Sequence, residues 1–429
     1  MTLPIPFRTL PLALAGLLVL APATPAQETS QEATEDGVEQ RLEKLEQHNA
    51  ELTRKVNLLT DELEYQDLGG LVPPVGESAF GMGPAASKVY AKIEGLSIGG
   101  YGESVYEDPA GPGDEWDALR TVFYFGYKFD EHWVFNSEIE IEHAGTGDDG
   151  EAAVEFATLD YISGGAVNGR AGLALIPMGL VNEMHEPTTF LPTHRSLTES
   201  RIIPSTWREN AVGVFGDAGP ISYRAYVANG LDATGFSASG LRGGRQKGSE
   251  ALADDLAIVV RADWTDTPGV LFGGSYYCGE SGQGQVGTPD AQSTIWEVHA
   301  ETGWRGFTAR GLAAMADVDD VTALNNSLGL VGTDSIGEEL EGAYVELGYD
   351  VMTELDPESG MSLSPFVRWE TIDTQSQVPA GFASDPANDD DVVTFGVNWK
   401  PIDRIVVKLD YMDFDQGTDG WNFSVGYVF

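Results

Sequence analysis

The last nine residues, WNFSVGYVF at 421–429, alternate large apolar side chains with small or polar ones. Successive side chains of a β-strand point to opposite faces, so one face of this segment is apolar along its whole length. That face carries Trp421, Phe423, Val425, Tyr427 and Phe429. The ends of soluble domains are usually polar and frayed. The segment therefore predicts a strand whose outer face meets lipid rather than water.

The same period of two runs back through the chain and predicts sixteen strands. They are expected at 96–106, 117–128, 132–143, 151–162, 168–178, 210–217, 220–229, 254–265, 268–278, 293–304, 306–317, 340–351, 361–372, 390–400, 402–413 and 419–429. A tilted strand needs about 9–11 residues to cross a bilayer, which most of these segments supply. Short and long connections alternate, as in outer-membrane barrels. We therefore predict an all-β fold, a 16-stranded antiparallel transmembrane β-barrel, over residues 91–429.

Charged side chains keep to one face of the predicted strands. In the strand at 132–143, Glu138, Glu140 and Glu142 share a face, while Ile139 lies on the other. A charge on the lipid face of a barrel costs about 2–4 kcal/mol at mid-membrane. This separation is therefore the pattern that a membrane barrel requires.

The strand at 151–162 breaks the alternation, because Phe156 and Leu159 cannot both face outward. A β-bulge inserts one extra residue into a strand and would shift the facing of the residues beyond it. The alternative is that the strand boundary has been misplaced.

Four segments precede the predicted barrel. Residues 1–26 combine one positive charge, an apolar run and a small-residue cleavage region, which is the pattern of a secretory signal peptide. Residues 27–37 are expected to be disordered. Apolar residues at spacings of three and four predict a coiled coil at 38–64, the alternative being a lone amphipathic helix packed on the barrel. Residues 65–90, rich in Gly, Pro, Ala and Ser, are predicted to be a linker.

The overall composition excludes several classes of function. A net charge of −44 excludes general nucleic-acid binding, because phosphates would repel the protein. A single cysteine, Cys278, excludes an internal disulfide. Acidic residues gather in the predicted long connections, for example at 319–320 and 389–391. Two interpretations stay open for them: a solvated acidic surface, or divalent cations bridging to lipid head groups.

The third long connection, GLVNEMHEPTTFLPTHRSLTESRIIPSTWRE at 179–209, is too long and too apolar for an external polar tip. Loops of this length without secondary structure are usually functional. We predict that it folds into the lumen and narrows it, since rings of charge at a constriction set channel selectivity. The alternative is that its arginines only pair with its glutamates and pin the loop.

The residues expected to act at this site fall into two groups. The constriction residues that would contact solute are His194, Arg195, Glu199, Arg201 and Arg208. The residues expected on the pore wall are Arg120, Glu138, Glu140, Arg170, Arg224, Arg261 and Arg368.

Three stretches carry a family resemblance. NEMHEPTTFL at 182–191 and IIPSTWREN at 202–210, together with strands such as GGYGESVYE at 99–107, resemble the phosphate-selective porin O and P family. The resemblance implies a trimeric sixteen-strand channel for small anionic solutes, with basic residues of the loop and wall carrying the ion. The predicted coiled coil is similar to that of dicarboxylate-importing porins. The many lumen acids and few lysines depart from the phosphate-selective pattern.

We therefore expect an outer-membrane porin for passive diffusion of small hydrophilic solutes, including anionic ones of phosphate or carboxylate type. The alternatives are a non-selective or cation-preferring porin, given the acidic loops, and a structural or adhesive barrel. Neither enzymatic activity nor a metal or cofactor is predicted, since the histidines lack a spacing such as H-E-x-x-H. A hydrolase would need His143 or His185 beside a carboxylate and a serine. The expected partners are outer-membrane lipid, the barrel-assembly machinery, small solutes and further copies in a homotrimer with a periplasmic coiled coil.

Overall fold

The computed structural model describes residues 44–45, 47–55, 75–147 and 150–429. The chain divides into two compact units, Met1–Glu64 and Tyr65–Phe429. In the first unit the described residues are helical, and Leu45 and Leu52 are exposed. The predicted signal peptide, the disordered segment 27–37 and much of the coiled coil lie outside the described residues.

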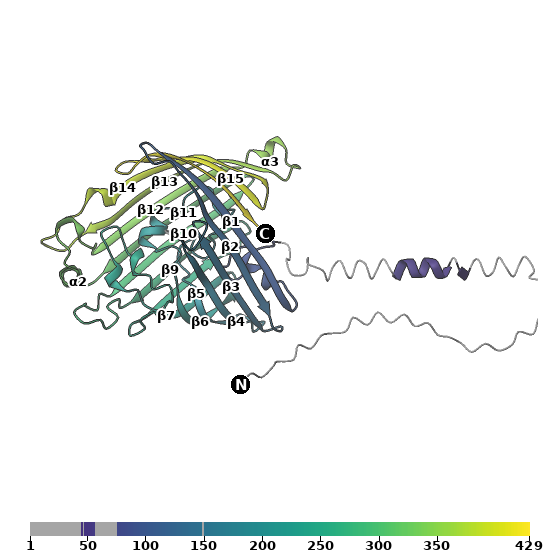
Figure 1. The fold of residues 1–429 in the computed structure, drawn as a ribbon, viewed down its shortest axis with the longest axis horizontal. Coiled ribbons are helices and arrows are strands. Elements are labelled where there is room, and N and C mark those ends of the chain that lie inside the picture. The colour runs from purple at the N-terminus through teal and green to yellow at the C-terminus, as the bar shows by residue number, and fades with distance from the viewer. Residues whose placement is uncertain (1–43, 46, 56–74, 148–149) are drawn as a thin grey trace, which may run out of the picture. The chain divides into compact units, whose positions relative to one another are not determined.

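The second unit is a closed barrel of sixteen antiparallel strands (Figure 1). The strands are β1 (Gly95–Pro109), β2 (Glu115–Lys128), β3 (Trp133–Glu142), β4 (Ala152–Tyr161), β5 (Asn168–Leu175), β6 (Arg208–Ala218), β7 (Ile221–Asn229), β8 (Leu256–Trp264), β9 (Val270–Gly279), β10 (Ser293–Trp304), β11 (Phe307–Val318), β12 (Glu339–Tyr349), β13 (Ser362–Gln377), β14 (Asp389–Ile402), β15 (Ile405–Phe414) and β16 (Gly420–Val428). Each one overlaps a predicted strand, so the sixteen-strand prediction is confirmed.

Short helical segments precede β1 and lie in several connections between strands. They are η2 (Ala86–Val89), η3 (Thr198–Ile202), η4 (Ala233–Gly235), η5 (Arg242–Gly244), α2 (Val321–Leu328), η6 (Gly332–Asp334), α3 (Met352–Leu355) and η7 (Pro386–Asn388). Among the described residues, no helix has the length and hydrophobicity needed to cross a membrane.

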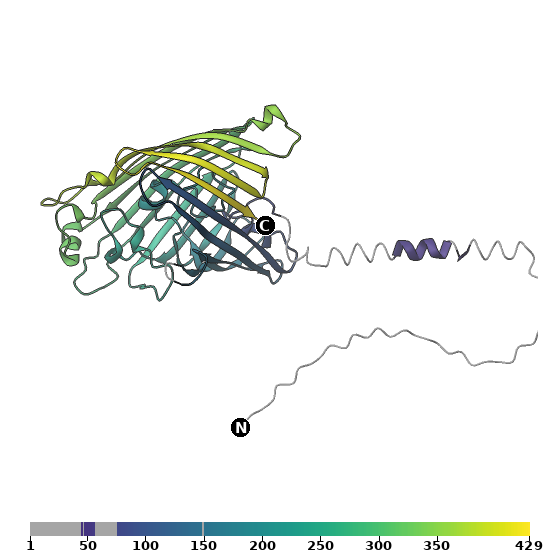
Figure 2. The ribbon, with the colours of Figure 1, turned by 45° about the horizontal axis from the view of Figure 1, so that its top comes forward.

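The barrel closes where β1 pairs with β16, and Figures 1 and 2 show the first strands beside the last ones. Tyr101 lies opposite Val428 in this ladder. Beyond it, the Phe429 N–H donates to the Gly100 carbonyl at 2.9 Å, and the Gly100 N–H donates to the Phe429 carbonyl at 3.1 Å. The apolar segment at 421–429 therefore forms the last strand of the barrel, which pairs with the first.

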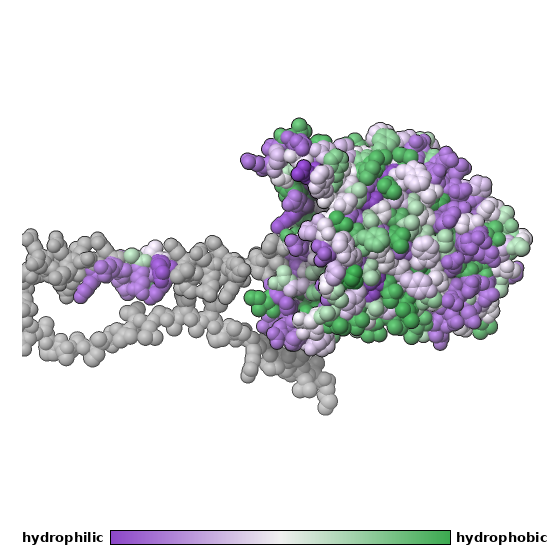
Figure 3. Space-filling model, turned by 180° about the vertical axis from the view of Figure 1, so that it is seen from behind, coloured by the Kyte–Doolittle hydropathy of each residue, from purple (hydrophilic) through white to green (hydrophobic). Residues whose placement is uncertain are grey.

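The two faces of the strands differ as their sequences predict. On β3, Glu138 and Glu140 are buried in the interior, while Ile139 between them is exposed on the outer surface. On β15, Lys408 is buried and Leu409 is exposed. Figure 3 shows hydrophobic residues spread over the visible barrel wall, with hydrophilic ones gathered toward the end that carries the long connections. An outer surface of this kind suits hydrocarbon.

A bulge in β4 explains the break in the alternation. Glu155 is the extra residue in the pairing of β3 with β4, and both Glu155 and Phe156 face the interior. Phe156 is fully buried, whereas Leu159 stays on the outer surface. Of the two interpretations of this strand, the bulge is therefore confirmed. It also places a carboxylate in the interior that regular alternation would have sent outward.

Within residues 75–92, most of them in the predicted linker 65–90, residues 82–83 and 85–89 are buried inside the barrel. All four residues of η2 are buried. The side-chain amide of Asn136 on β3 donates to the Ala86 carbonyl at 2.9 Å. The close packing of residues 82–89 differs from the flexible linker predicted at 65–90, because small residues here allow close approach to the wall.

Further contacts hold the end of this segment to the wall. Tyr90 donates to Asp160 on β4 at 2.6 Å and accepts from Arg170 on β5 at 3.1 Å. A side chain at Gly126 on β2 would clash, because its Cβ would lie 2.5 Å from the Val89 Cβ. The inner wall is thus shaped to receive residues 75–92, which we call the inner N-terminal segment.

Candidate functional site

The connection between β5 and β6, residues 176–207, contacts the inward-facing side chains of strands from β2 round to β15. We call it the third loop. Its side chains and backbone bind Arg120, Glu138, Glu155, Arg224, Arg261, Arg310, Tyr344, Arg368, Glu370, Asn398, Lys400, Lys408 and Asp410. Six backbone carbonyls between residues 188 and 194 accept from wall side chains. Charged wall residues therefore satisfy a backbone that has little secondary structure of its own.

One side chain ties the two ends of the third loop together. The Asn182 amide donates to the Ile176 carbonyl at 2.7 Å and to the Trp207 carbonyl at 2.9 Å. Its Oδ1 accepts from the Trp207 N–H at 2.8 Å. Asn182 is almost fully buried, so these bonds form where water cannot replace them.

A cavity of about 480 Å³ opens between the third loop and the loop-side ends of β1, β2, β3, β15 and β16. Its lining includes Arg120, His194, Arg195, Arg242 and the acids Glu103, Glu107 and Glu142. Both signs of charge therefore face the same space.

Arg195 and Arg242 line this cavity, and Arg245 contacts its lining residues Ser205 and Thr206. Arg195 and Arg242 each donate to the Ser205 hydroxyl at 3.4 Å. Arg245 donates to the Thr206 carbonyl at 3.0 Å. No carboxylate of the described residues forms an ion pair with any of these three guanidinium groups. We call them the arginine cluster.

The environment of the arginine cluster disfavours its positive charge. Burial lowers the pKa of Arg195, and the positive charge of Arg120 lowers it further. Burial and the neighbouring Arg242 and Arg208 lower the pKa of Arg245 to about 9. A bound anion would relieve this repulsion, since an opposite charge within about 4–6 Å favours the charged form.

Two of the three acids that line the cavity are paired with cations, and the third, Glu142, forms no ion pair with a described residue. Glu103 accepts from Arg120 at 2.9 Å, and both side chains are buried. Glu107 pairs with His194 at 3.0 Å. Burial alone would lower the pKa of His194, but the hydrogen bond and charge of Glu107 outweigh it and raise that pKa.

The predicted constriction residues lie in different surroundings. His194 and Arg195 line the cavity. Arg208 starts β6 and pairs with Glu155 at 2.5 Å, deep in the interior. Glu199 is buried and accepts from the Val181 N–H at 2.9 Å and from Tyr344 at 2.7 Å. Arg201 lies in η3 and is not one of the lining residues.

The predicted pore-wall residues all face the interior and are nearly all engaged with other groups. Arg170 pairs with Asp160, which lies directly opposite it in the ladder of β4 and β5. Arg224 and Arg261 both pair with Asp263. The others are Arg120, Glu138, Glu140 and Arg368, each 6% exposed or less. Apart from Arg120, none of them lines the cavity. Contacts with the third loop come from Glu138, Arg224, Arg261 and Arg368, and Arg170 contacts the inner N-terminal segment.

Sequence reasoning missed Arg242 and Arg245, which come from the fourth long connection. Nothing marks them in the sequence except two arginines in the glycine-rich run LRGGRQKG at 241–248. Their approach to Ser205 and Thr206 depends on how two long loops meet, which local patterns do not report.

One sequence match to a catalytic motif was also missed. GLSIG at 95–99 has the G-x-S-x-G spacing of a hydrolase nucleophile elbow. That elbow needs a sharp strand-to-helix turn, whereas Ser97 lies in β1, regularly paired with Gly126 on β2. The stretch is therefore part of the barrel wall.

No family model matches the chain. A protein of Aquifex aeolicus (strain VF5), described as uncharacterized, is 38% identical over 359 residues, which cover 80% of this chain and 81% of that one. Salmonella typhi OmpF in complex with daunomycin covers 79% of this chain and 98% of its own at 12% identity, with a TM-score of 0.54. OmpTdeltaL8, a loop-deletion mutant of an outer membrane protein of Vibrio cholerae, covers 79% and 100% at 12% identity, with a TM-score of 0.52. The trimer form of Vibrio cholerae OmpT covers 79% and 100% at 11% identity, with a TM-score of 0.50.

These structural likenesses show the fold alone. The fold is that of the sixteen-strand outer-membrane porins. The closer resemblance to the phosphate-selective porin family stays a prediction.

Proposed function

The chain belongs to the same protein family as the uncharacterized Aquifex aeolicus protein, and from its porin fold we propose that it is an outer-membrane channel for passive diffusion of small hydrophilic solutes. We further propose that the third loop narrows the lumen and that the channel prefers anions. Phosphate-type and carboxylate-type anions are the solutes that a guanidinium group binds best.

The observation that carries the anion preference is the arginine cluster. Arg195 and Arg242 line the cavity and share one neutral hydroxyl partner, Ser205, instead of a carboxylate. Glu103 and Glu107 are each paired with a cation. Glu142 is the one lining acid without an ion pair among the described residues, so two unpaired arginines face one unpaired carboxylate in the cavity, although the chain as a whole carries a charge of −44.

The reversal potential of the purified protein in a planar bilayer, measured across a salt gradient, tests this proposal. We expect an anion-preferring channel, and replacement of Arg195 or Arg242 by alanine to shift the reversal potential toward cations. A unit charge about 6 Å from the ion path contributes about 0.7 kcal/mol in a water-like dielectric, which is about a threefold change in anion permeability per arginine.

Arg305→Ala provides the matched control. Arg305 is exposed in the short connection between β10 and β11, stacks on Trp304 with 5.0 Å to the ring centroid, and does not line the cavity. Its loss should leave the reversal potential unchanged. An open channel with the same selectivity in the Arg195→Ala and Arg242→Ala variants would contradict the anion proposal and favour a non-selective porin.

A structural barrel without conductance is the second candidate. It is favoured by the two segments that occupy the interior, the third loop and residues 75–92. Complete absence of conductance from correctly folded protein would favour this role over the channel.

We also propose a homotrimer held partly by a periplasmic coiled coil at 38–64. Leu45 and Leu52, both predicted seam positions, are exposed in the single chain. Chemical cross-linking of the full chain and of a variant lacking 38–64 tests this proposal. A trimer band that depends on these residues would support it, and a monomer in both would contradict it.

A further inference from the structure

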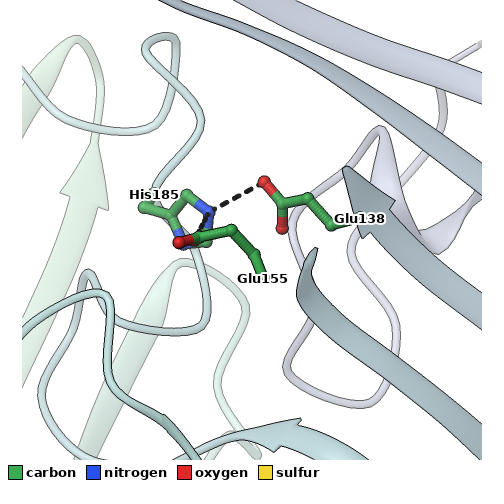
Figure 4. Close-up of side chains that lie close together, drawn as sticks. All are labelled: Glu138, Glu155 and His185. Carbon is green, nitrogen blue, oxygen red and sulfur yellow. Dashed lines mark hydrogen bonds and ion pairs between the residues drawn. The ribbon is translucent and has the colours of Figure 1, made fainter. Parts of the chain in front are cut away.

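A histidine and two glutamates converge in the interior between the third loop and the wall (Figure 4). Glu138 comes from β3, Glu155 from the bulge in β4, and His185 from the third loop. Their exposed fractions are 0%, 1% and 2%. One nitrogen or oxygen atom from each lies within 4.8 Å of the others. We call these three residues the His–Glu trio.

The orientation of His185 directs one ring nitrogen at both carboxylates. Its Nδ1 bonds the Asn182 carbonyl at 2.9 Å, which requires a proton on Nδ1. Its Nε2 lies 3.2 Å from Glu138 Oε1 and 3.6 Å from Glu155 Oε2. Metal-binding histidines characteristically donate their second ring nitrogen to such a carbonyl.

The contact of His185 Nε2 with Glu138 lies at the outer limit of hydrogen bonding, and its contact with Glu155 lies beyond that limit. A charge-assisted N–H···O⁻ bond is about 2.7–2.9 Å long, which is shorter than both contacts of Nε2. Ligand atoms bound at about 2.0–2.2 Å around a tetrahedral ion lie about 3.3–3.6 Å from one another. The separations of Nε2 from the two carboxylate oxygens are close to this range.

A second buried histidine shows what the hydrogen-bonded alternative looks like. His299 Nδ1 lies 2.8 Å from Glu297 Oε2, and its Nε2 lies 2.9 Å from Asp263 Oδ1. Both lengths are those of an imidazolium donating to two carboxylates. His185 has no carboxylate at that distance, so the two histidines are held in different ways.

The carboxylate oxygens of the trio differ in their hydrogen-bond partners. Glu155 Oε2, which faces His185, has no donor among the described residues except the neighbouring Glu140 carboxyl group, which donates only when protonated. Its other oxygen, Oε1, accepts from Arg208 at 2.5 Å, which fixes the carboxylate. Tyr101 donates to Glu138 Oε1 at 3.1 Å. A buried acceptor without a donor is costly and calls for an unseen partner such as an ion.

We propose that Glu138, Glu155 and His185 bind one divalent transition-metal ion of the Zn²⁺ class. One imidazole nitrogen and two carboxylate oxygens form a mixed ligand set suited to such an ion, and three protein ligands leave a fourth position for water. The ion would join the third loop to β3 and β4. The proposal is independent of conductance, since a channel can operate with or without the ion.

Zinc binding to the full chain tests the proposal. Chelator-treated protein, refolded in detergent, is titrated with ZnCl₂ against a chromogenic zinc chelator that outcompetes the acidic loops. We expect one retained equivalent of zinc per chain and, in crystals, an anomalous zinc peak between the three side chains. No retained equivalent, or a peak elsewhere, would overturn the proposal and leave a proton as the partner of the trio.

Two variants and a control complete the design. His185→Gln and Glu155→Gln keep the approximate size of each side chain, and both should weaken zinc binding by about 100-fold or more, beyond the 10- to 100-fold effect of an outer-shell change. His299→Gln should retain the full equivalent. Retention by folded His185→Gln protein would overturn the assignment. If neither trio variant folds, the position of the anomalous peak in the natural sequence decides.

Discussion

Replacing Asn182 by alanine should release the third loop while leaving the barrel closed. The two carbonyls that lose the Asn182 amide keep a backbone donor each, because Ile176 accepts from Met178 at 2.8 Å and Trp207 accepts from Ile176 at 2.9 Å. Loss of the two hydrogen bonds from the Asn182 amide therefore costs about 0.5 kcal/mol of loop stability each, which is the low end for a hydrogen bond. The Trp207 N–H loses its partner in a buried site, which costs about 1–3 kcal/mol. The sum is about 2–4 kcal/mol.

Hydrogen exchange followed by mass spectrometry measures this change directly. Since 1.4 kcal/mol is a factor of ten, amides of residues 176–207 should exchange about 30- to 700-fold faster in Asn182→Ala. Amides of the strands should keep their protection, because each strand is paired on both sides. Asn182→Asp keeps the acceptor for the Trp207 N–H and should have a smaller effect.

Asn210→Ala is the control, because Asn210 is exposed and its amide makes one long bond of 3.3 Å to Gly248. It should leave exchange in the third loop unchanged. Less than a threefold change in Asn182→Ala would refute the view that this side chain anchors the loop.

Three further predictions concern the inner N-terminal segment, His194 and Trp207. Removing residues 75–92 should raise the single-channel conductance, because this segment occupies the lumen, whereas removing 38–64 should not; equal conductance in all three proteins would contradict the role of the segment. The preference for anions should fall as the pH rises through the raised pKa of His194, since the contact with Glu107 favours the protonated ring below that pKa and the cavity loses a positive charge above it. His194→Gln should remove this step, and a step that persists would assign it to another group. Trp207→Ala should lower the free energy of unfolding by about 3–5 kcal/mol in urea titrations from lipid vesicles, because Trp207 is 1% exposed; a loss below 1 kcal/mol would show that the site collapses around the cavity.

The strands and their two faces were predictable because the signal is local. Lipid on one side and a polar interior on the other impose a period of two on each strand, as with Glu138, Ile139 and Glu140. Even the bulge at Glu155 could be inferred from the failure of that period. Its consequence, a carboxylate facing His185, could not be inferred, since it depends on a loop about thirty residues further on.

The contents of the barrel were not predictable in the same way. Val89 packs against the backbone of Gly126 inside the barrel. Nothing in the sequence indicates that a glycine in a strand and a small-residue segment before the barrel are in contact. The same composition that indicates a flexible linker also permits tight packing.

The ion pairs of the interior were less predictable than the strands and more predictable than the segments packed inside the barrel. Arg170 and Asp160 face each other across adjacent strands, so the ladder register would have predicted their ion pair once the turn was placed. The three members of the arginine cluster come from two different loops, and no register relates them.

The pairing of β1 with β16 also means that the barrel can close only after synthesis of both strands. A ribosome makes β1 before β16, so the barrel cannot close until β16 has been synthesised and delivered. Until then two rows of unpaired backbone groups stand open, and such edges recruit any strand within reach. A chain cut short before residue 420 would lack the partner of β1 entirely, and we expect it to be degraded or to aggregate before it reaches a membrane.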